Sequence, residues 1–226
     1  MKSKIVVLAV LAVVFLMAGC AQKADDSKKV PNKEAKEWRK NLHNSPYVVY
    51  EKFDNAVLDY EELKKQLSAD VHIKLYMGSK LSIDSVWEYR LFMLNINGKE
   101  VAEEYTNDYN TVRYYADGKW NASSKEELQD WATGWSTLMG ELGLPQIKGF
   151  VVPNADILAF KKKSKEIFVA FGLKTEGGDE VKPLFTNKKR GPREAEGLDM
   201  VGAAPNELNM DNCMPCPKVC AGNEIL

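Results

Sequence analysis

Apolar and polar residues alternate along several stretches in the middle of the chain. Between residues 71 and 77 the sequence VHIKLYM places Val, Ile, Leu and Met on one face and His, Lys and Tyr on the other. Strict alternation of this kind is typical of a strand with one buried face. Asn97-Gly98 and Asp117-Gly118 are two-residue turn signals that predict antiparallel hairpins. Similar stretches predict further strands, at 86–96, 99–105, 111–115, 148–152, 166–172 and 181–185, with a short one at 157–160.

Other stretches repeat their apolar residues at steps of three and four, which is the spacing of one helix face. Ser123 and Ser124 are each followed three residues later by glutamate, which makes a capping box at a helix start. Gly143 ends that helix. The same spacing predicts a helix over 52–68, and a short one is expected over 32–42. The apolar stripe of the clearest helix, which we expect to face the core, comprises Leu128, Trp131, Trp135, Leu138 and Leu142.

The order of these elements predicts an α+β fold. We expect an antiparallel sheet of about five to seven strands packed with one or two helices, and a β-sandwich with an inserted helix is the alternative. The globular domain is expected over residues 46–186. Residues 20–45 are mostly polar and are expected to form a tether. Residues 187–226 contain no aromatic side chain and are rich in Gly, Pro and charge, so a disordered tail is expected there.

The first residues of the chain have the pattern of an export signal. Lys2 and Lys4 supply positive charge, and residues 5–18 are continuously apolar. A run of this length is too short for a membrane-spanning helix, which needs roughly 20 apolar residues. It suits the apolar region of a signal peptide instead. The run ends on two small residues and Cys20.

The sequence Leu16-Met17-Ala18-Gly19-Cys20 resembles the lipobox of bacterial lipoproteins. The resemblance covers residues 1–20 only, and Met17 stands where that class prefers Leu. It implies that residues 1–19 are a cleaved signal peptide and that the thiol of Cys20 carries fatty acyl chains, such as palmitate. The protein would then be anchored by lipid in the bacterial cell envelope. Ala21 stands where Asp would retain a protein at the inner membrane, so the outer membrane is favoured.

Charge narrows the choice of partners. The 31 basic residues include Lys2 and Lys4, so the chain from Cys20 onward carries 29 basic against 32 acidic residues. This near-neutral balance gives no electrostatic basis for binding nucleic acid. The chain has only two histidines, which argues against a catalytic or metal site built on histidine.

The other three cysteines, Cys213, Cys216 and Cys220, lie within the sequence CMPCPKVC. Thiolates at this spacing can bind a soft metal ion, although a structural zinc site needs a fourth ligand. In an oxidising compartment, two of the three can instead form a disulfide, which leaves the third free or bonded to another molecule. The sequence leaves these alternatives open.

Several aromatic residues in the predicted strands are candidates for a partner-binding surface: Tyr105, Tyr109, Tyr114 and Trp120. The chain shows no pairing of nucleophile and base that fits a catalytic motif. The expected function is therefore non-enzymatic, with no cofactor apart from a possible soft metal ion. A lipid-anchored α+β domain would bind an envelope protein or a glycan. The alternative is a metal-handling or thiol-redox lipoprotein that acts through the three cysteines.

Overall fold

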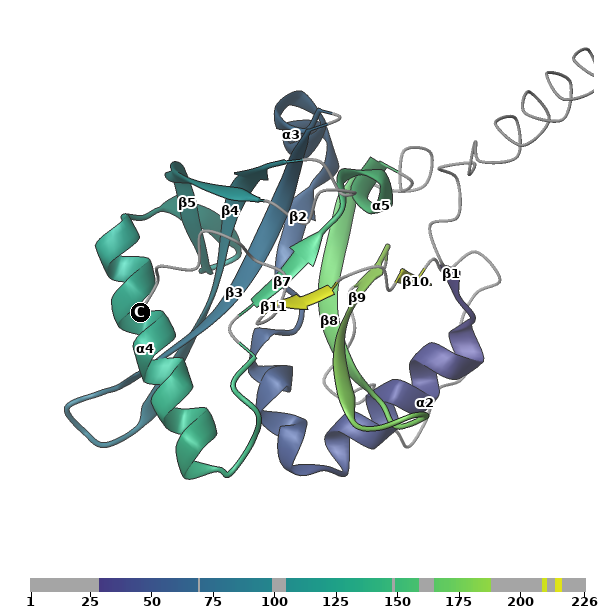
Figure 1. The fold of residues 1–226 in the computed structure, drawn as a ribbon, viewed down its shortest axis with the longest axis vertical. Coiled ribbons are helices and arrows are strands. Elements are labelled where there is room, and N and C mark those ends of the chain that lie inside the picture. The colour runs from purple at the N-terminus through teal and green to yellow at the C-terminus, as the bar shows by residue number, and fades with distance from the viewer. Residues whose placement is uncertain are drawn as a thin grey trace, which may run out of the picture.

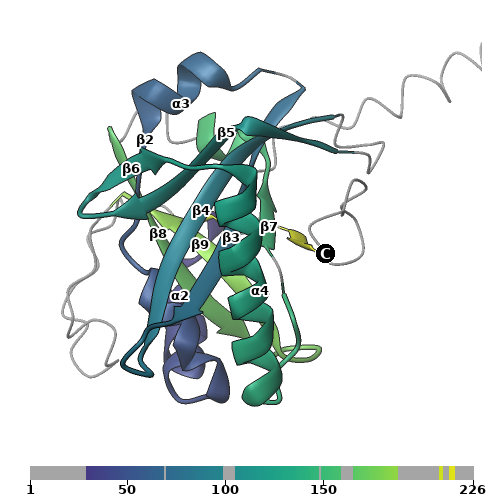
Figure 2. The same ribbon diagram turned by 90° about the vertical axis from the view of Figure 1, so that its left-hand side faces the viewer.

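The computed structural model describes residues 29–68, 70–98, 105–147, 149–158, 165–187, 209–210 and 214–216. The prediction of an α+β fold is confirmed. Two antiparallel sheets lie face to face, α4 (Lys125–Glu141) covers the outer face of the larger sheet, and α2 (Asn32–His43) covers the outer face of the smaller one (Figures 1 and 2). The domain thus has four layers, in the order helix, sheet, sheet, helix.

The larger sheet contains the strands that the alternating pattern predicts best. Its strands are ordered β11 (Met214–Cys216), β7 (Gly149–Val152), β3 (Val71–Leu81), β4 (Trp87–Asn97), β5 (Thr106–Ala116) and β6 (Lys119–Ala122). The smaller sheet is ordered β1 (Lys29–Val30), β10 (Asn209–Met210), β9 (Glu180–Thr186), β8 (Glu166–Lys174) and β2 (Val57–Asp59). Every pair of neighbours is antiparallel.

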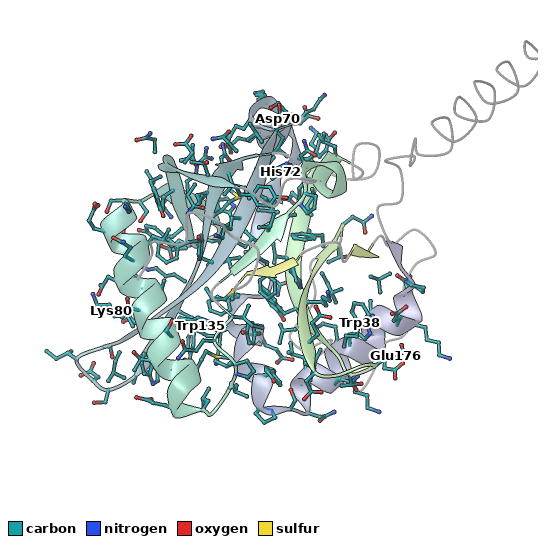
Figure 3. The ribbon with its side chains drawn as sticks, in the orientation of Figure 1. Trp38, Asp70, His72, Lys80, Trp135 and Glu176 are labelled. Carbon is teal, nitrogen blue, oxygen red and sulfur yellow. The ribbon has the colours of Figure 1, made fainter. Side chains whose placement is uncertain are left out.

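The main hydrophobic core lies between the two sheets. Leu75 and Met77 of β3 face Val169 and Phe171 of β8 within one continuous cluster of buried side chains. Trp135 of α4 reaches the same cluster and is almost fully buried (Figure 3). The core therefore joins the two sheets and the end of α4 into one folded unit.

Helix α4 begins and packs as its sequence predicts. The hydroxyl of Ser124 accepts a hydrogen bond from the Glu127 N–H (3.1 Å), which satisfies a free donor at the helix start. Leu128, Trp131, Trp135 and Leu138 are buried, which confirms the core-facing stripe for these four residues. The prediction is wrong for Leu142, which follows the end of the helix and is 46% exposed. Gly143 has a φ of +66° and follows the helix end, as a residue without a Cβ can do at little cost.

The helix predicted over 32–42 is confirmed, but it belongs to the folded domain rather than to a tether. Trp38, Arg39 and Leu42 of α2 are all buried. Gly172 of β8 permits this contact, because a Cβ there would lie 2.9 Å from the Cβ of Trp38. The expected boundary at residue 46 therefore falls too late in the chain.

The prediction of one helix over 52–68 is wrong. The chain forms a 3-10 helix, η1 (Pro46–Phe53), then β2, then α3 (Tyr60–Gln66). Asn55 has a left-handed φ of +65°, and its N–H donates to the carbonyl of Val169 (2.8 Å). Pairing with β8 thus takes precedence over helical spacing. The strand expected at 157–160 is also wrong where the structure describes it, because α5 (Asn154–Leu158) occupies that position.

Two other predictions lie largely outside the described residues. The strand expected over 99–105 is described only at Tyr105, which precedes β5 and is not in a strand. Of the expected tail, the described residues after 187 form only β10, which lies between β1 and β9, and β11, which pairs with β7 at the edge of the larger sheet. The hairpin predicted at Asp117-Gly118 is confirmed by β5 and β6, with positive φ at both turn residues.

Candidate functional site

The candidate site is built around η1, whose sequence repeats its large apolar residues every three positions. Tyr47, Tyr50 and Phe53 share one face because a 3-10 helix has three residues per turn, and all three are buried. Ser45 begins the helix by accepting a hydrogen bond from the Tyr47 N–H (3.2 Å). The outward positions include Val48, which is 39% exposed. Helix η1 thus presents apolar side chains both to the core and to the surface.

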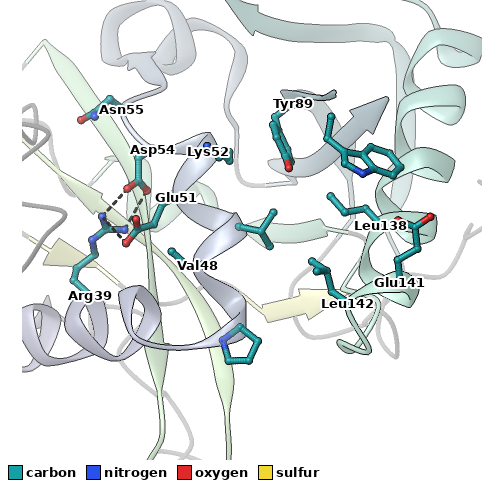
Figure 4. A pocket seen from close by; sticks show the side chains of 13 residues that line it. Arg39, Val48, Glu51, Lys52, Asp54, Asn55, Tyr89, Leu138, Glu141 and Leu142 are labelled. Atoms are coloured by element: carbon teal, nitrogen blue, oxygen red, sulfur yellow. Dashed lines mark hydrogen bonds and ion pairs between the residues drawn. The ribbon is translucent and has the colours of Figure 1, made fainter. Parts of the chain in front are cut away.

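An ion pair fixes η1 to α2 and β8. Both terminal nitrogens of Arg39 donate to the carboxylate of Asp54, at 3.2 and 2.6 Å. Arg39 Nη1 also donates to the carbonyl of Phe171 (2.5 Å), and the Phe171 N–H donates to Asp54 (3.1 Å). Glu51 adds a third charge, 3.8 Å from Arg39. Figure 4 shows this cluster beside η1.

Burial changes the acidity of Asp54. Loss of solvent raises the pKa of this carboxyl to about 6, while Arg39 and the Phe171 N–H act in the opposite direction. The Arg39 guanidinium forms the two-pronged pairing that fits a carboxylate best. Asp54 is therefore a structural partner of Arg39 whose charge depends on pH near neutrality.

A groove of about 900 Å³ opens between η1, the start of β4 and the end of α4. Tyr89 of β4 lies on one side, and Leu138 of α4 and Leu142, which follows α4, lie on another (Figure 4). Trp87 of β4 also lines the groove. The 13 described residues that line it are Arg39, Pro46, Val48, Val49, Glu51, Lys52, Asp54, Asn55, Trp87, Tyr89, Leu138, Glu141 and Leu142. A mostly apolar groove with a few charged groups is the usual form of a binding site.

The β3–β4 hairpin extends the apolar surface beyond the groove. Leu81 of β3 lies directly opposite Trp87 of β4, so both side chains are on the groove face of the sheet. The hairpin then projects past the rest of the sheet (Figures 1 and 2). We call Leu81, Ile83 and Val86 the tip; they are 51%, 100% and 60% exposed.

The tip is an ordered turn. The Ser85 N–H donates to the carbonyl of Ser82 (3.0 Å), and the Ser82 N–H donates to the carbonyl of Val86 (2.8 Å). Ser85 has a φ of +60°, so the loop is a tight turn followed by a left-handed residue. At the base, Lys80 forms an exposed ion pair with Asp130 of α4 (2.6 Å; Lys80 is labelled in Figure 3). This turn does not require an apolar residue at Ile83.

Exposed apolar residues are concentrated at this end of the domain. Among the described residues, the large hydrophobic side chains that are exposed are Val48, Leu81, Ile83, Val86 and Leu142. Val48 and Leu142 line the groove, and the other three form the tip. Such clustering differs from the scattered single residues that are normal on protein surfaces.

The aromatic residues proposed from sequence as a partner surface lie elsewhere. Tyr105 is buried, and Tyr109 and Tyr114 are only partly exposed and pack against the core beneath α4. Trp120 is also partly buried, and its indole N–H donates to the carbonyl of Val57 (2.6 Å). The structure does not bring these four side chains together as an exposed platform.

The cysteines proposed from sequence are mostly outside the described residues. This applies to Cys20, Cys213 and Cys220. Cys216 ends β11, where its backbone pairs with Gly149 at the edge of the larger sheet. Within the described parts of the chain, no three Cys, His, Asp or Glu side chains are grouped in a way that could hold a metal ion.

Sequence reasoning missed the groove because its walls are far apart in the chain. Val49, Trp87 and Leu138 come from three separate elements. One local signal was available: Ile83 lies between two serines and an aspartate, within the polar turn between two predicted strands. An aliphatic residue at that position has no role in the turn itself.

A scan of the chain against protein-family models found no match, and searches of curated proteins and of solved structures found none either. Of the helices that the structure describes, none combines the length and apolar character needed to cross a membrane. The functional argument therefore depends on the residues themselves.

Proposed function

We propose that this protein is a bacterial envelope lipoprotein, anchored through acyl chains on Cys20, whose α+β domain binds an envelope partner without enzymatic activity. The anchor rests on the sequence of residues 1–20, and the outer membrane is the proposed location. Anchoring confines the domain to a thin layer at the membrane, which raises the local concentration for a weak partner. The observation that carries the binding proposal is the apolar groove with its exposed tip.

The chemistry of this surface favours a protein partner. The fully exposed Ile83 and the other tip residues are aliphatic, and they would lose their contact with water on meeting apolar side chains of another protein. The groove walls offer Lys52 and Glu141 at the surface for polar contacts. A glycan is the second partner class, for which Trp87 and Tyr89 would supply the aromatic rings.

The anchor can be tested by labelling cells with a radioactive fatty acid. The full chain should incorporate the label, and Cys20→Ala should abolish it. Cys213→Ala is the matched control and should be labelled as the native chain is. Equal labelling of the native chain and Cys20→Ala would refute the anchor. Separation of the two membranes by density then tests the location.

The binding surface can be tested by placing a photo-reactive amino acid in the full chain in cells. A probe at Leu81, within the tip, should yield a specific adduct. A probe at Glu176, an exposed residue in the turn between β8 and β9, is the control. Figure 3 shows Glu176 far from Lys80 at the base of the tip. Equal adducts from both positions, or none from position 81, would contradict the proposal.

A second candidate function is metal or thiol chemistry at Cys213, Cys216 and Cys220. The observation that favours it is that β11 pairs with β7, so that the chain around Cys216 returns to the domain. Native mass spectrometry of the full chain, purified without chelator or reductant, is the test. Added mass of one metal ion that Cys213→Ser removes would support the metal site. A mass lower by two hydrogens would indicate a disulfide.

A further inference from the structure

The tip is a projection and the groove is a hollow, and both lie at the same end of one molecule. The tip is convex and carries a fully exposed Ile83, whereas the groove is concave and lined by Val49, Trp87 and Leu138. Because Leu81 and Trp87 are cross-strand neighbours, the two features are contiguous. The tip does not occupy the groove of its own chain, because the β3–β4 hairpin projects past the rest of the sheet (Figures 1 and 2).

We propose that the tip of one molecule docks into the groove of a second copy, and that the second tip docks into the first groove. A two-fold axis generates this arrangement without any further surface, because each contact is then made twice. A heterologous partner would need only one of the two features. Their presence side by side is the observation that favours a second copy.

Charge complementarity sets the register of the contact. Asp84 follows Ile83 at the tip, and Lys52 lies in the groove lining near Tyr89, with its ammonium 6.0 Å from the ring centroid. Neither Asp84 nor Lys52 forms an ion pair with any other residue that the structure describes. In the two-fold pair, each Asp84 would meet the Lys52 of the other copy at the groove rim.

A lipid surface is the competing occupant of the tip, and the charges argue against it. Asp84 lies within the tip, Glu88 lies close to it in the chain, and Glu141 lies at the groove. The neighbouring Lys80 is already paired with Asp130. Anionic phospholipids attract basic clusters and repel such carboxylates. The apolar tip is therefore better matched to the groove than to a bilayer.

The test uses the full chain in cells, with a photo-reactive amino acid at Glu141 on the groove rim. The expected product is a covalent dimer whose cross-linked peptide contains residues 81–86 of the second copy. Ile83→Asp should reduce the dimer about tenfold or more, because removal of a central apolar anchor removes most of the binding energy. Ile83 is fully exposed, so this variant should retain its thermal unfolding midpoint.

Reversal of the charges at Asp84 and Lys52 is the second part of the test. Asp84→Lys and Lys52→Glu should each reduce the dimer, and the combination of the two should restore it. A dimer unaffected by Ile83→Asp, or cross-linking to lipid, would overturn the proposal. An adduct with a different protein that Ile83→Asp removes would also overturn it, while supporting the partner binding proposed above. Self-association uses the same surface as the proposed partner binding but requires only a second copy of this chain. The dimer can therefore be absent while another protein still binds, so the two proposals can fail separately.

Discussion

Gly134 of α4 lies against the main chain of Ser79 in β3, so closely that a Cβ at position 134 would overlap the Ser79 carbonyl oxygen. The glycine therefore sets the distance between the helix and the larger sheet. The following residue, Trp135, enters the main core because the helix can approach this far.

Gly134→Ala should lower the free energy of unfolding by about 3 kcal/mol, because the added methyl group must push α4 away from β3. Gly140→Ala, on the same helix, is the matched control. A Cβ at position 140 would have only the flexible amide of Gln146 near it, at 3.9 Å. That variant should be more stable by up to about 1 kcal/mol, through helix propensity alone. Denaturant titration of both variants distinguishes close packing from a general effect of alanine.

Removal of Arg39 should be costly, because it leaves Asp54 buried without its counter-ion. Arg39→Met should lower the free energy of unfolding by about 3–5 kcal/mol at neutral pH. Arg39→Lys should cost less, because it keeps the charge but loses the two-pronged geometry. Denaturant unfolding near neutral pH would measure both. Equal losses for the two variants would mean that the charge contributes little.

The pH dependence of stability should reveal the raised pKa of Asp54. The unfolded carboxyl loses its proton near pH 3.8, whereas the folded one keeps it up to a pKa of about 6. The folded state therefore binds more protons between these values, so this group's contribution is full below pH 3.8 and is lost as pH rises through 6. The stability of the native chain relative to Asp54→Asn should fall across that window.

Ile83→Ser should leave the free energy of unfolding within about 0.5 kcal/mol of the native value, because the side chain contacts nothing in the fold. Thermal and denaturant unfolding would measure this. A loss of more than about 1 kcal/mol would show that Ile83 packs against the domain in solution. Unchanged stability would mean that its apolar character is not needed for folding.

Sequence patterns predicted the helices and strands whose apolar residues follow one clear local spacing. Alternation located β3 correctly, and α4 has a clear apolar stripe between a capping serine and Gly143. The expectation that β3 has only one buried face is wrong, because His72, Lys74 and Tyr76 on its other face are buried as well. In η1 the three-residue repeat of Tyr47, Tyr50 and Phe53 was hidden, because it overlaps a longer stretch with α-helical spacing. The break after Phe53 depends on Asp54, whose partners are 15 and 117 residues away.

The assignment of α2 to a tether failed for a related reason. Its composition is polar, and only Trp38 stands out in the sequence. Its burial depends on the space above Gly172 and on the pairing of Arg39, which no local pattern reveals. The groove was also beyond local patterns, since three distant segments form its walls. The exposed Ile83 in a polar turn was the one local sign of the site.

The hydrogen bond from Arg39 to the Phe171 carbonyl spans 132 positions in the chain. A ribosome makes residue 39 long before residue 171, so during synthesis α2 has no sheet on which to dock. Contacts of such long range also make folding slow. The emerging chain must therefore wait with Trp38 and Leu42 still exposed to water. The packing of α2 is therefore among the last steps of folding, since it requires β8 to be complete.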